Sequence, residues 1–425
     1  MTERSEEMKP PHGGRGGSSP HKQHSTERSE EMKPPHGGRG GSSPHKQHST
    51  ERSEEMKPPH GGRGGSSPHK QHSTERSEEM KPPHGGRGGS SPHEEHSEHY
   101  RPVDSMRRPR FASGPRTFMR LPYVQDPMTA TGRIDVAIVG VPTDSAVGYR
   151  SGARFGPEAI RSASILLRDH NPETGIDVTR LSMVDAGDAP VVPGYHDLTL
   201  QRLEDHLLPF YERGILPLLL GGDHSLAMAE MRAMARVHGP LSVVHFDAHG
   251  DVLDDYYGVK HFHGTMFRRA VEEGIVDAGR SIQAGMRGSV HPEDVGAAEA
   301  LGYEVIRWRE LALMAPAEFG RRVRARVGDR PVMVSFDIDF VDPAYAPGTG
   351  TPEVGGPSSG LTLELLRALG PLDYRGIDIV EVAPPYDHGD ITSHLASVVA
   401  FELLGQVAAV RRPGTAVPSS SGPLS

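Results

Sequence analysis

The 425-residue sequence contains no cysteine, one tryptophan and few aromatic residues. The absence of cysteine excludes a disulfide framework, a thiolate nucleophile, an iron–sulfur cluster and a zinc site built on sulfur. Long apolar runs are also missing, since the longest strongly apolar run, Ile215 to Leu220, is far shorter than the roughly 20 residues of a membrane span. No apolar stretch near the N-terminus resembles a signal peptide. We therefore expect a cytoplasmic protein with no membrane contact.

The N-terminal segment lacks the side chains from which a core is built. Residues 2–97 are four copies of a 24-residue unit, and the last copy differs only at Glu94 and Glu95. Methionine supplies the only apolar side chains of residues 1–97, too few for solenoid repeats to stack. We predict that residues 1–97 are a disordered, low-complexity tail. The three histidines of each copy leave weak metal binding open as an alternative to a plain solvated linker.

The rest of the chain has the composition of a folded, acidic domain. Its 328 residues hold 32 basic and 42 acidic side chains, because 15 Lys+Arg and 14 Asp+Glu lie in residues 1–97. An acidic domain argues against nucleic acid as the main partner. We predict one catalytic domain over residues 98–412 and a flexible tail, rich in Pro, Ser and Gly, over residues 413–425.

Short apolar segments rich in Val, Ile and Leu alternate with helical patterns from residue 134 onward, which predicts an α/β domain with a mostly parallel sheet of about eight strands. The predicted strands are Ile134–Val141, Leu181–Asp185, Ile215–Leu220, Leu241–Phe246, Ser281–Gly285, Glu304–Trp308, Val332–Phe336 and Gly376–Val382. Helices fit between them, for example Pro157–Leu167, Leu198–Glu212, Leu226–Val237, Pro316–Arg326 and Leu363–Leu369.

Polar side chains follow four of these strands, where an open parallel sheet places its ligand site. The segments are GGDHS (221–225), DAHGD (247–251), DID (337–339) and EVAPPYD (381–387). The alternation in D-x-H-x-D and D-x-D points the side chains of each motif the same way on an extended backbone. Helix capping, the ordinary role of a lone Asp at a strand end, does not explain two such motifs together.

Crowded carboxylates repel one another unless cations lie between them, so these motifs predict bound metal. Four aspartates and two histidines exceed the needs of one ion and fit two ions that share bridging carboxylates. Oxygen-rich ligation without sulfur favours Mn²⁺ over Zn²⁺. The predicted ligands are His224, Asp247, His249, Asp251, Asp337 and Asp339.

At this point the sequence resembles a known family. The four segments, His263-Gly264 and the stretch SFDIDFVDPAYAPGTGTPE (335–353) are similar to the motifs of the ureohydrolases, which include arginases, agmatinases and guanidino-acid hydrolases. The resemblance runs from about residue 120 to 410. It implies a three-layer α/β/α arginase-like fold, two Mn²⁺ ions per subunit, homo-oligomers (trimers or hexamers), and hydrolysis of a guanidino group to urea and an amine.

The resemblance also implies a role for each site residue. One ion would be bound by His224, Asp247, Asp251 and Asp337, and the other by Asp247, His249, Asp337 and Asp339, so that Asp247 and Asp337 bridge. Asp251 would also orient the attacking hydroxide, Glu381 would pair with the guanidinium group, and His263 would protonate the departing amine. His261 is a rival for the last role, but only His263 is followed by Gly-Thr as in agmatinase-type sequences.

The small guanidino substrate is less closely defined. The loop Val252–Lys260 contains none of the Asn and Ser residues with which arginases hold the amino-acid end of arginine, and the pattern is closest to agmatinase. We therefore predict hydrolysis of agmatine to putrescine and urea, a step of polyamine biosynthesis, with a guanidino-acid hydrolase such as 4-guanidinobutyrase as the alternative. Asp254 and Asp255 could attract the ammonium of agmatine, unless they are solvated loop residues. A carboxylate-tailed substrate such as 4-guanidinobutyrate would instead need a cation, which Arg150 could supply.

The sequence departs from the family pattern at two places. Gly250 replaces a more usual Thr or Ala, which predicts a roomier pocket. The segment Gly148–Pro157 lacks the family's usual Asn-Arg-Pro, which leaves the identity of the substrate tail undecided.

A non-catalytic metal-binding protein of the same fold is a distant alternative function. Amide deacetylation on a related architecture is another, which the number of metal ions would distinguish.

Overall fold

The structure is a computed structural model that describes residues 99–102 and 115–414. The predicted disordered tail of residues 1–97 lies outside the described residues. The predicted C-terminal tail does too, except for Pro413 and Gly414.

A sheet of eight parallel strands forms the centre of the domain, in the order β4-β1-β5-β10-β9-β6-β7-β8. Each of the eight strands predicted from the sequence is present, with ends shifted by three residues at most. A short antiparallel pair, β2 with β3, was not predicted. The strands are β1 (Val136–Gly140), β2 (His170–Asn171), β3 (Ile176–Asp177), β4 (Met183–Asp188), β5 (Leu216–Leu220), β6 (Ser242–Phe246), β7 (Ile282–Ala284), β8 (Glu304–Ile306), β9 (Pro331–Asp337) and β10 (Asp373–Val380).

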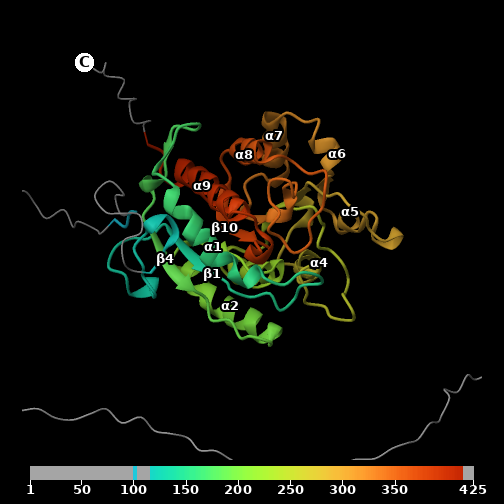
Figure 1. Cartoon of the computed structure of the whole chain (residues 1–425), viewed down its shortest axis with the longest axis horizontal. Helices are drawn as coiled ribbons and strands as arrows, with labels where there is room; N and C mark the ends of the chain where they lie inside the picture. The colour runs from blue at the N-terminus through green and yellow to red at the C-terminus, as the bar shows by residue number, and fades with distance from the viewer. Residues whose placement is uncertain (1–98, 103–114, 415–425) are drawn as a thin grey trace, which may run out of the picture. The chain divides into compact units, whose positions relative to one another are not determined.

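Helices cover both faces of the sheet, which gives the three layers that were predicted (Figure 1). Alternate residues of β1 enter opposite cores: Val136 and Ile138 belong to the core that also contains residues of α1, α7, α8 and α9, whereas Ala137 and Val139 belong to the core that contains residues of α2, α3 and α4. The helices are α1 (Gly156–Ala163), α2 (His196–Glu212), α3 (Ala227–His238), α4 (Met266–Glu272), α5 (Ala297–Leu301), α6 (Trp308–Leu311), α7 (Pro316–Val327), α8 (Ser359–Ala368) and α9 (Ile391–Arg411).

The longest helix, α9, was not among the helices named from the sequence, because small and polar residues interrupt its apolar pattern. Its length and composition would allow it to span a membrane, but 78% of the relevant window is buried inside the domain. Buried Glu402 within it pairs with Arg367 at 2.5 Å and with Asn171 at 2.8 Å. These are the properties of a core helix of the folded domain.

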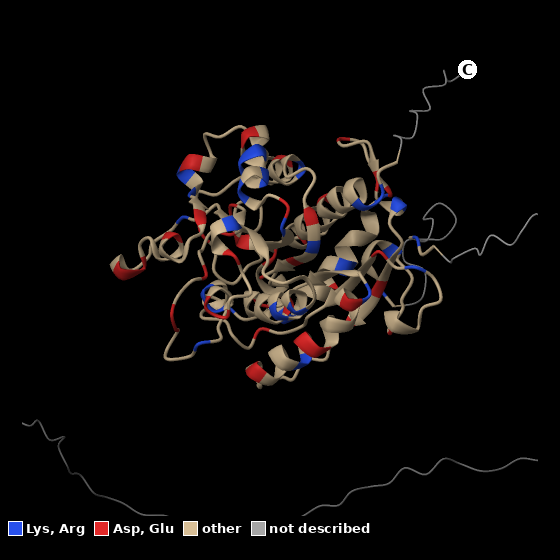
Figure 2. Cartoon of the chain, turned by 180° about the vertical axis from the view of Figure 1, so that it is seen from behind, with Lys and Arg blue, Asp and Glu red and all other residues tan. Residues whose placement is uncertain are grey.

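The outer surface carries both signs of charge. Acidic and basic residues are interspersed along the helices and loops rather than separated by sign (Figure 2). Examples are the pairs Arg232–Glu273 at 2.5 Å and Arg307–Glu299 at 2.6 Å. Such exposed pairs contribute little to stability. The stability of the domain therefore comes mainly from the two apolar cores.

The order of the strands explains where polar side chains meet. The four strands with polar C-terminal ends, β5, β10, β9 and β6, are consecutive neighbours at the centre of the sheet. The C-terminal ends of these strands are aligned. Ile379 of β10 pairs with Leu220 of β5 on one side and with Phe336 of β9 on the other. Phe336 in turn pairs with Phe246 of β6. The polar segments that follow these strands therefore converge at one edge.

Candidate active site

The turn after β5 brings His224 beneath the centre of the site. This turn can form only because Gly221 and Gly222 lack side chains. A Cβ atom on Gly222 would lie 2.0 Å from the Thr143 carbonyl oxygen. Asp223 accepts hydrogen bonds from the Ser225 and Ala146 backbone N–H groups, each at 3.1 Å. The GGDHS motif thus positions His224 and ties its turn to the loop after β1.

His224 is the centre of a first group of ligand atoms. Its Nδ1 lies 3.2 Å from Asp247 Oδ2, 2.9 Å from Asp251 Oδ2 and 3.3 Å from Asp337 Oδ2. Although fully buried, Nδ1 has no hydrogen-bond partner among the described residues. One nitrogen and three carboxylate oxygens therefore face a common point, as the ligands of a metal ion do.

A second group forms around His249. Its Nδ1 lies 3.3 Å from Asp247 Oδ1 and 3.1 Å from Asp339 Oδ2. The two oxygens of Asp247 thus face different histidines. Asp337 adjoins the second group through its Oδ1, which accepts the Asp339 backbone N–H at 2.8 Å. The structure brings all six predicted metal ligands together.

The charge of these groups also fits divalent cations. Burial, reinforced by Asp339 and Asp247, raises the pKa of Asp337 well above its usual range. Burial and Asp247 raise the pKa of Asp339 to about 6. Neighbouring ligand atoms of a six-coordinate ion with bonds of about 2.1 Å lie about 3 Å apart, close to the spacings around both histidines. The residues present therefore fit hard divalent ions.

His263 and Glu381 meet beside the first group. His263 Nδ1 lies 3.2 Å from Glu381 Oε1, and the Gly148 backbone N–H points at His263 Nε2 at 3.1 Å. Burial lowers the pKa of His263, but Glu381 and two nearby aspartates outweigh it and raise the pKa to about 9. The carboxylates favour the protonated ring and the Gly148 N–H favours the neutral ring, which suits a group that gains and releases a proton. The rival, His261, contacts the exposed Asp197 instead.

Two site residues adopt a backbone conformation that is rare outside glycine. Asp251 has a φ of 50° and Glu381 a φ of 61°. Such a conformation costs about 1–3 kcal/mol and persists where the surrounding structure enforces it, often at functional sites. Both residues turn back toward His224: Asp251 reaches its ring, and Glu381 accepts its backbone N–H at 2.9 Å.

A cavity of about 470 Å³ opens above the ligands, and His249, Asp251, His263 and Asp337 line it. Gly250 also lines it, and a Cβ atom there would contact only Gln283 and Val252, at 3.6 Å, so the missing side chain widens the cavity. Tyr256 and Phe262, stacked at 4.4 Å, and Tyr149 form part of the wall. The sequence analysis did not predict these aromatic residues.

The three residues predicted to contact the substrate tail are not among those lining the cavity. Asp254 binds Lys260 at 2.6 Å and Arg269 at 2.8 Å, and Asp255 accepts the Gly258 backbone N–H at 2.9 Å. These contacts are those of loop-stabilising residues. Arg150 lies near the mouth, where its guanidinium packs over the rings of Tyr149 and Tyr386 at 5.3 and 4.9 Å.

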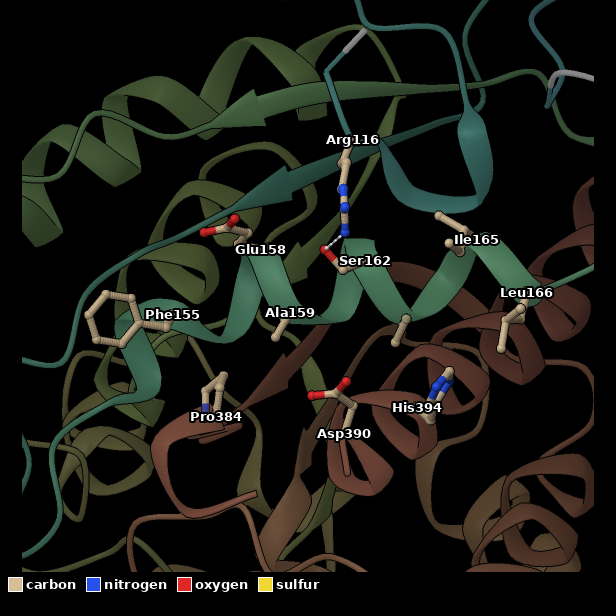
Figure 3. A pocket seen from close by; sticks show the side chains of 11 residues that line it. Arg116, Phe155, Glu158, Ala159, Ser162, Ile165, Leu166, Pro384, Asp390 and His394 are labelled. Atoms are coloured by element: carbon tan, nitrogen blue, oxygen red, sulfur yellow. Dashed lines mark hydrogen bonds between the residues drawn. The ribbon is translucent and has the colours of Figure 1, made fainter. Parts of the chain in front are cut away.

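A larger cavity, of about 530 Å³, lies elsewhere, between α1 and the start of α9 (Figure 3). Arg116 donates to Ser162 at 3.1 Å on its α1 side, and Asp390, just before α9, and His394 of α9 face the cavity from the other side. This cavity is lined by none of the metal-binding candidates. The smaller cavity is therefore the candidate active site.

The sequence analysis also missed polar residues directly behind the ligands. His245, Ser335 and Asp378 lie level on three adjacent strands. His245 Nε2 is 2.8 Å from Asp247 Oδ2, and Ser335 Oγ is 2.8 Å from His224 Nε2. The signal was present, because His245 and Ser335 stand two residues before Asp247 and Asp337 and continue the same alternation.

The fold and site together define a class: a three-layer α/β/α protein with a carboxylate-rich metal site at the carboxyl edge of its sheet. The model of the arginase family matches residues 134–405. Guanidinopropionase of Pseudomonas aeruginosa is 43% identical over 312 residues, 72% of this chain and 96% of that protein. Mitochondrial agmatinase of Gallus gallus is 40% identical over 290 residues, 68% of this chain and 84% of that protein. The chain belongs to the arginase family.

A solved structure agrees. Proclavaminate amidino hydrolase from Streptomyces clavuligerus superimposes with a TM-score of 0.67 at 42% identity, covering 71% of this chain and 99% of that chain. These comparisons confirm the predicted resemblance to ureohydrolases and the arginase-like fold. The protein is an enzyme, a hydrolase that cleaves guanidino compounds.

Proposed function

We propose that this ureohydrolase uses two Mn²⁺ ions to hydrolyse a carboxylate-tailed guanidino compound to urea and an amine. The observation that carries the metal assignment is the pair of groups around His224 and His249, each of which contains one oxygen of Asp247. One group would hold each ion, and Asp247 and Asp337 would bridge. When bound, the ions lower the pKa of a shared water so that hydroxide is available at neutral pH.

The residues of the chain then have distinct tasks. Asp251 orients the nucleophile as it adds to the guanidinium carbon. Glu381 Oε1 already accepts the His224 N–H and contacts His263, whereas its Oε2 lies toward Gly350 and can accept guanidinium N–H groups. The bond from the central carbon to the substituted nitrogen breaks, and His263 protonates that nitrogen as it leaves.

Two observations favour a carboxylate tail over the ammonium of agmatine. Lys260 and Arg269 bind Asp254, so its charge is compensated, and neither Asp254 nor Asp255 lines the cavity. Arg150 does not line the cavity either, but it packs over the cavity residue Tyr149 and has no ion pair with a described carboxylate, so its charge is not compensated. The names of the relatives do not decide the question, since they include both a guanidinopropionase and agmatinases.

Agmatine is the second candidate, because the acidic residues Asp294 and Glu299 also line the cavity. Glu299 is paired with Arg307, which leaves Asp294 as the acid that could meet an ammonium group. Cytoplasmic location and assembly into homo-oligomers remain predictions from the sequence.

The experiment measures urea release by the manganese-loaded protein from 3-guanidinopropionate, 4-guanidinobutyrate, agmatine and arginine. We expect a preference for a carboxylate-tailed compound. Arg150→Met should raise the KM for the carboxylate-tailed compound roughly 10-fold or more, because one charge-assisted contact is lost. The kcat for agmatine should be unchanged. Arg150→Lys, which keeps the charge, is the matched control. A preference for agmatine with no effect of Arg150→Met would reverse the assignment.

A further inference from the structure

Arg287, in the loop after β7, joins the two loops that carry the ligand atoms of the second group. Its backbone N–H donates to the Ala248 carbonyl oxygen at 2.9 Å, between Asp247 and His249. Its side-chain Nη2 donates to the Asp339 carbonyl oxygen at 2.8 Å. Arg287 therefore contacts the backbone of both metal-binding motifs, and the proposed reaction gives this residue no task.

These contacts close a ring of three residues from three different loops. The Ala248 backbone N–H donates to Asp339 Oδ1 at 3.1 Å. Ala248 thus contacts the Asp339 carboxylate through its N–H and Arg287 through its carbonyl oxygen, while Arg287 contacts the Asp339 carbonyl oxygen. The ring restrains Asp339, a predicted metal ligand, both at its side chain and at its backbone.

The guanidinium group of Arg287 also holds the segments next to this ligand. Nη1 donates to the Phe340 carbonyl oxygen at 2.9 Å, and Nη2 donates to the Glu353 carbonyl oxygen at 2.8 Å. Thr351, two residues before Glu353, donates its hydroxyl to Asp339 Oδ2 at 3.2 Å. A guanidinium is planar and its N–H groups have fixed directions, so it can hold several carbonyl groups in one geometry. Arg287 therefore also fixes the segment that contacts the Asp339 carboxylate.

The surroundings of the guanidinium are built for contacts with the backbone. Its hydrogen bonds within the described residues all go to backbone carbonyl oxygens. A Cβ atom on Gly356 would lie 2.5 Å from Arg287 Nη2 and 2.9 Å from the Asp342 backbone nitrogen, so a side chain there would displace the guanidinium. The arginine thus acts on the backbone of the loops and leaves the carboxylates free to bind metal.

We propose that Arg287 is a positioning residue that holds Asp339 in the geometry that binds the metal ion of the second group. Without the guanidinium, the Asp339 backbone and the segment 351–353 would be free to move, and the Asp339 carboxylate would lose part of its fixed direction. A ligand that must be ordered on binding gives a weaker site than one ordered in advance. Arg287 therefore sets the affinity for the ion held by His249 and Asp339 without touching that ion.

The sign of the effect separates positioning from charge. A cation beside two metal ions repels them, so an arginine that acted only through its charge would weaken metal binding. Its replacement by a neutral residue would then tighten the binding of both ions. A positioning role predicts the opposite result, because replacement of Arg287 should weaken the binding of the ion that Asp339 holds.

The inference rests on the two-metal site of the proposed function, and the test distinguishes failure of the two. The full-length protein is stripped of metal and titrated with Mn²⁺, and the electron paramagnetic resonance of free Mn²⁺ gives the number of bound ions and a dissociation constant for each. Failure of the wild-type protein to bind two ions would defeat the proposed site itself. Binding of two ions by the wild type, with no change in the Arg287 variants, would overturn only the inference.

Arg287→Met and Arg324→Met form the decisive pair. Arg324 likewise donates to backbone carbonyl oxygens, those of Ala368 and Leu369 at 2.8 and 2.7 Å, but it does not line the candidate active site. Arg287→Met should weaken the binding of one ion about 10–100-fold, the usual effect of losing a partner behind a metal ligand, and leave the other within about threefold. Arg324→Met should bind both ions as the wild type does. An equal loss in Arg324→Met would reduce the effect to general destabilisation and overturn the inference.

Arg287→Lys keeps the inference open to refutation even if the Met variant does not fold. Lysine retains the positive charge, but its single ammonium group cannot reach all the carbonyl groups that the planar guanidinium holds, so the same ion should bind at least about threefold more weakly than in the wild type. Wild-type affinity for both ions in the folded Lys variant would overturn the role assigned to Arg287. Tighter binding in the Met variant, or equal weakening of both ions, would overturn it as well.

Discussion

The two halves of the metal site share Asp247 but differ in their surroundings. His224 is 0% exposed, faces three carboxylate oxygens and is held from behind by Ser335. The side chain of His249 is 34% exposed and faces two carboxylate oxygens, and its Nε2 lies 4.0 Å from Glu353, too far for a hydrogen bond.

The His224 half is therefore closed and pre-arranged, whereas the His249 half opens to the cavity. Charge interactions are stronger in a buried site, and a ligand held by a second partner loses less freedom on binding. We expect the His224 half to bind its ion more tightly and the His249 half to exchange its ion with solvent.

The largest effect should come from removing the carboxylate that the two halves share. Asp247→Ala should abolish binding of the metal pair and lower turnover by more than about 100-fold, the upper range for partners that do not touch the metal. Metal content by mass spectrometry and urea release measure this. Asp255→Ala, in the loop nearby, is the control. Asp337→Ala should behave like Asp247→Ala, and retained turnover in either variant would contradict the bridging assignment.

Removing one histidine at a time should have a smaller effect and should show which half binds its ion more tightly. The His249→Asn variant should keep close to one tightly bound ion per subunit after gel filtration in metal-free buffer, because the His224 half remains intact. The His224→Asn variant should keep fewer ions per subunit, because the substitution removes a ligand of the closed half. Equal metal content in the two variants would show that burial does not determine which half binds its ion more tightly.

The strand-end residues of both halves could be predicted from the sequence, and the physical reason is general. Parallel strands bring their carboxyl ends to one edge. The extended backbone assumed for the alternating motifs was wrong, because β6 ends at Phe246 and Asp339 lies in a 3-10 turn, Ile338–Phe340. The Asp247 and Asp337 carboxylates instead accept the backbone N–H groups of His249 and Asp339, and these local turns hold each pair together. The eight strands were recognisable because strands buried on both faces are nearly continuous in Val, Ile and Leu.

What could not be predicted depends on contacts between distant segments. Asp254 resembled a substrate-binding acid until Arg269, 15 residues away, proved to be its partner. Glu230 stands in a predicted helix, but only the fold brings its carboxyl group 3.3 Å from the hydroxyl of Tyr211. Local spacing does not report which charges the fold will pair.

The titration of His263 tests how strongly the carboxylates next to the closed half favour a protonated ring. Its pKa in the folded, metal-free protein is raised to about 9 from an ordinary value of about 6.5 in the unfolded chain. A raised pKa contributes stability that is fully present below pH 6.5 and is lost as the pH rises through 9. Urea denaturation of the metal-free protein at pH 6, 8 and 10 should therefore show a loss that His263→Asn lacks. Parallel profiles for the two proteins would contradict the ion pair with Glu381.

The smallest effect is expected at the mouth of the open half. Asp254 lies on the surface and outside the cavity, where Lys260 and Arg269 bind it and lower its pKa to about 2. Exposed pairs of this kind are screened by solvent. Asp254→Asn should therefore change kcat/KM for agmatine and for 4-guanidinobutyrate by less than about twofold, whereas Arg150→Met should affect only the second substrate. A selective loss of agmatine turnover in Asp254→Asn would show that the ammonium reaches this loop after all, and would place the substrate tail on the acidic side of the mouth.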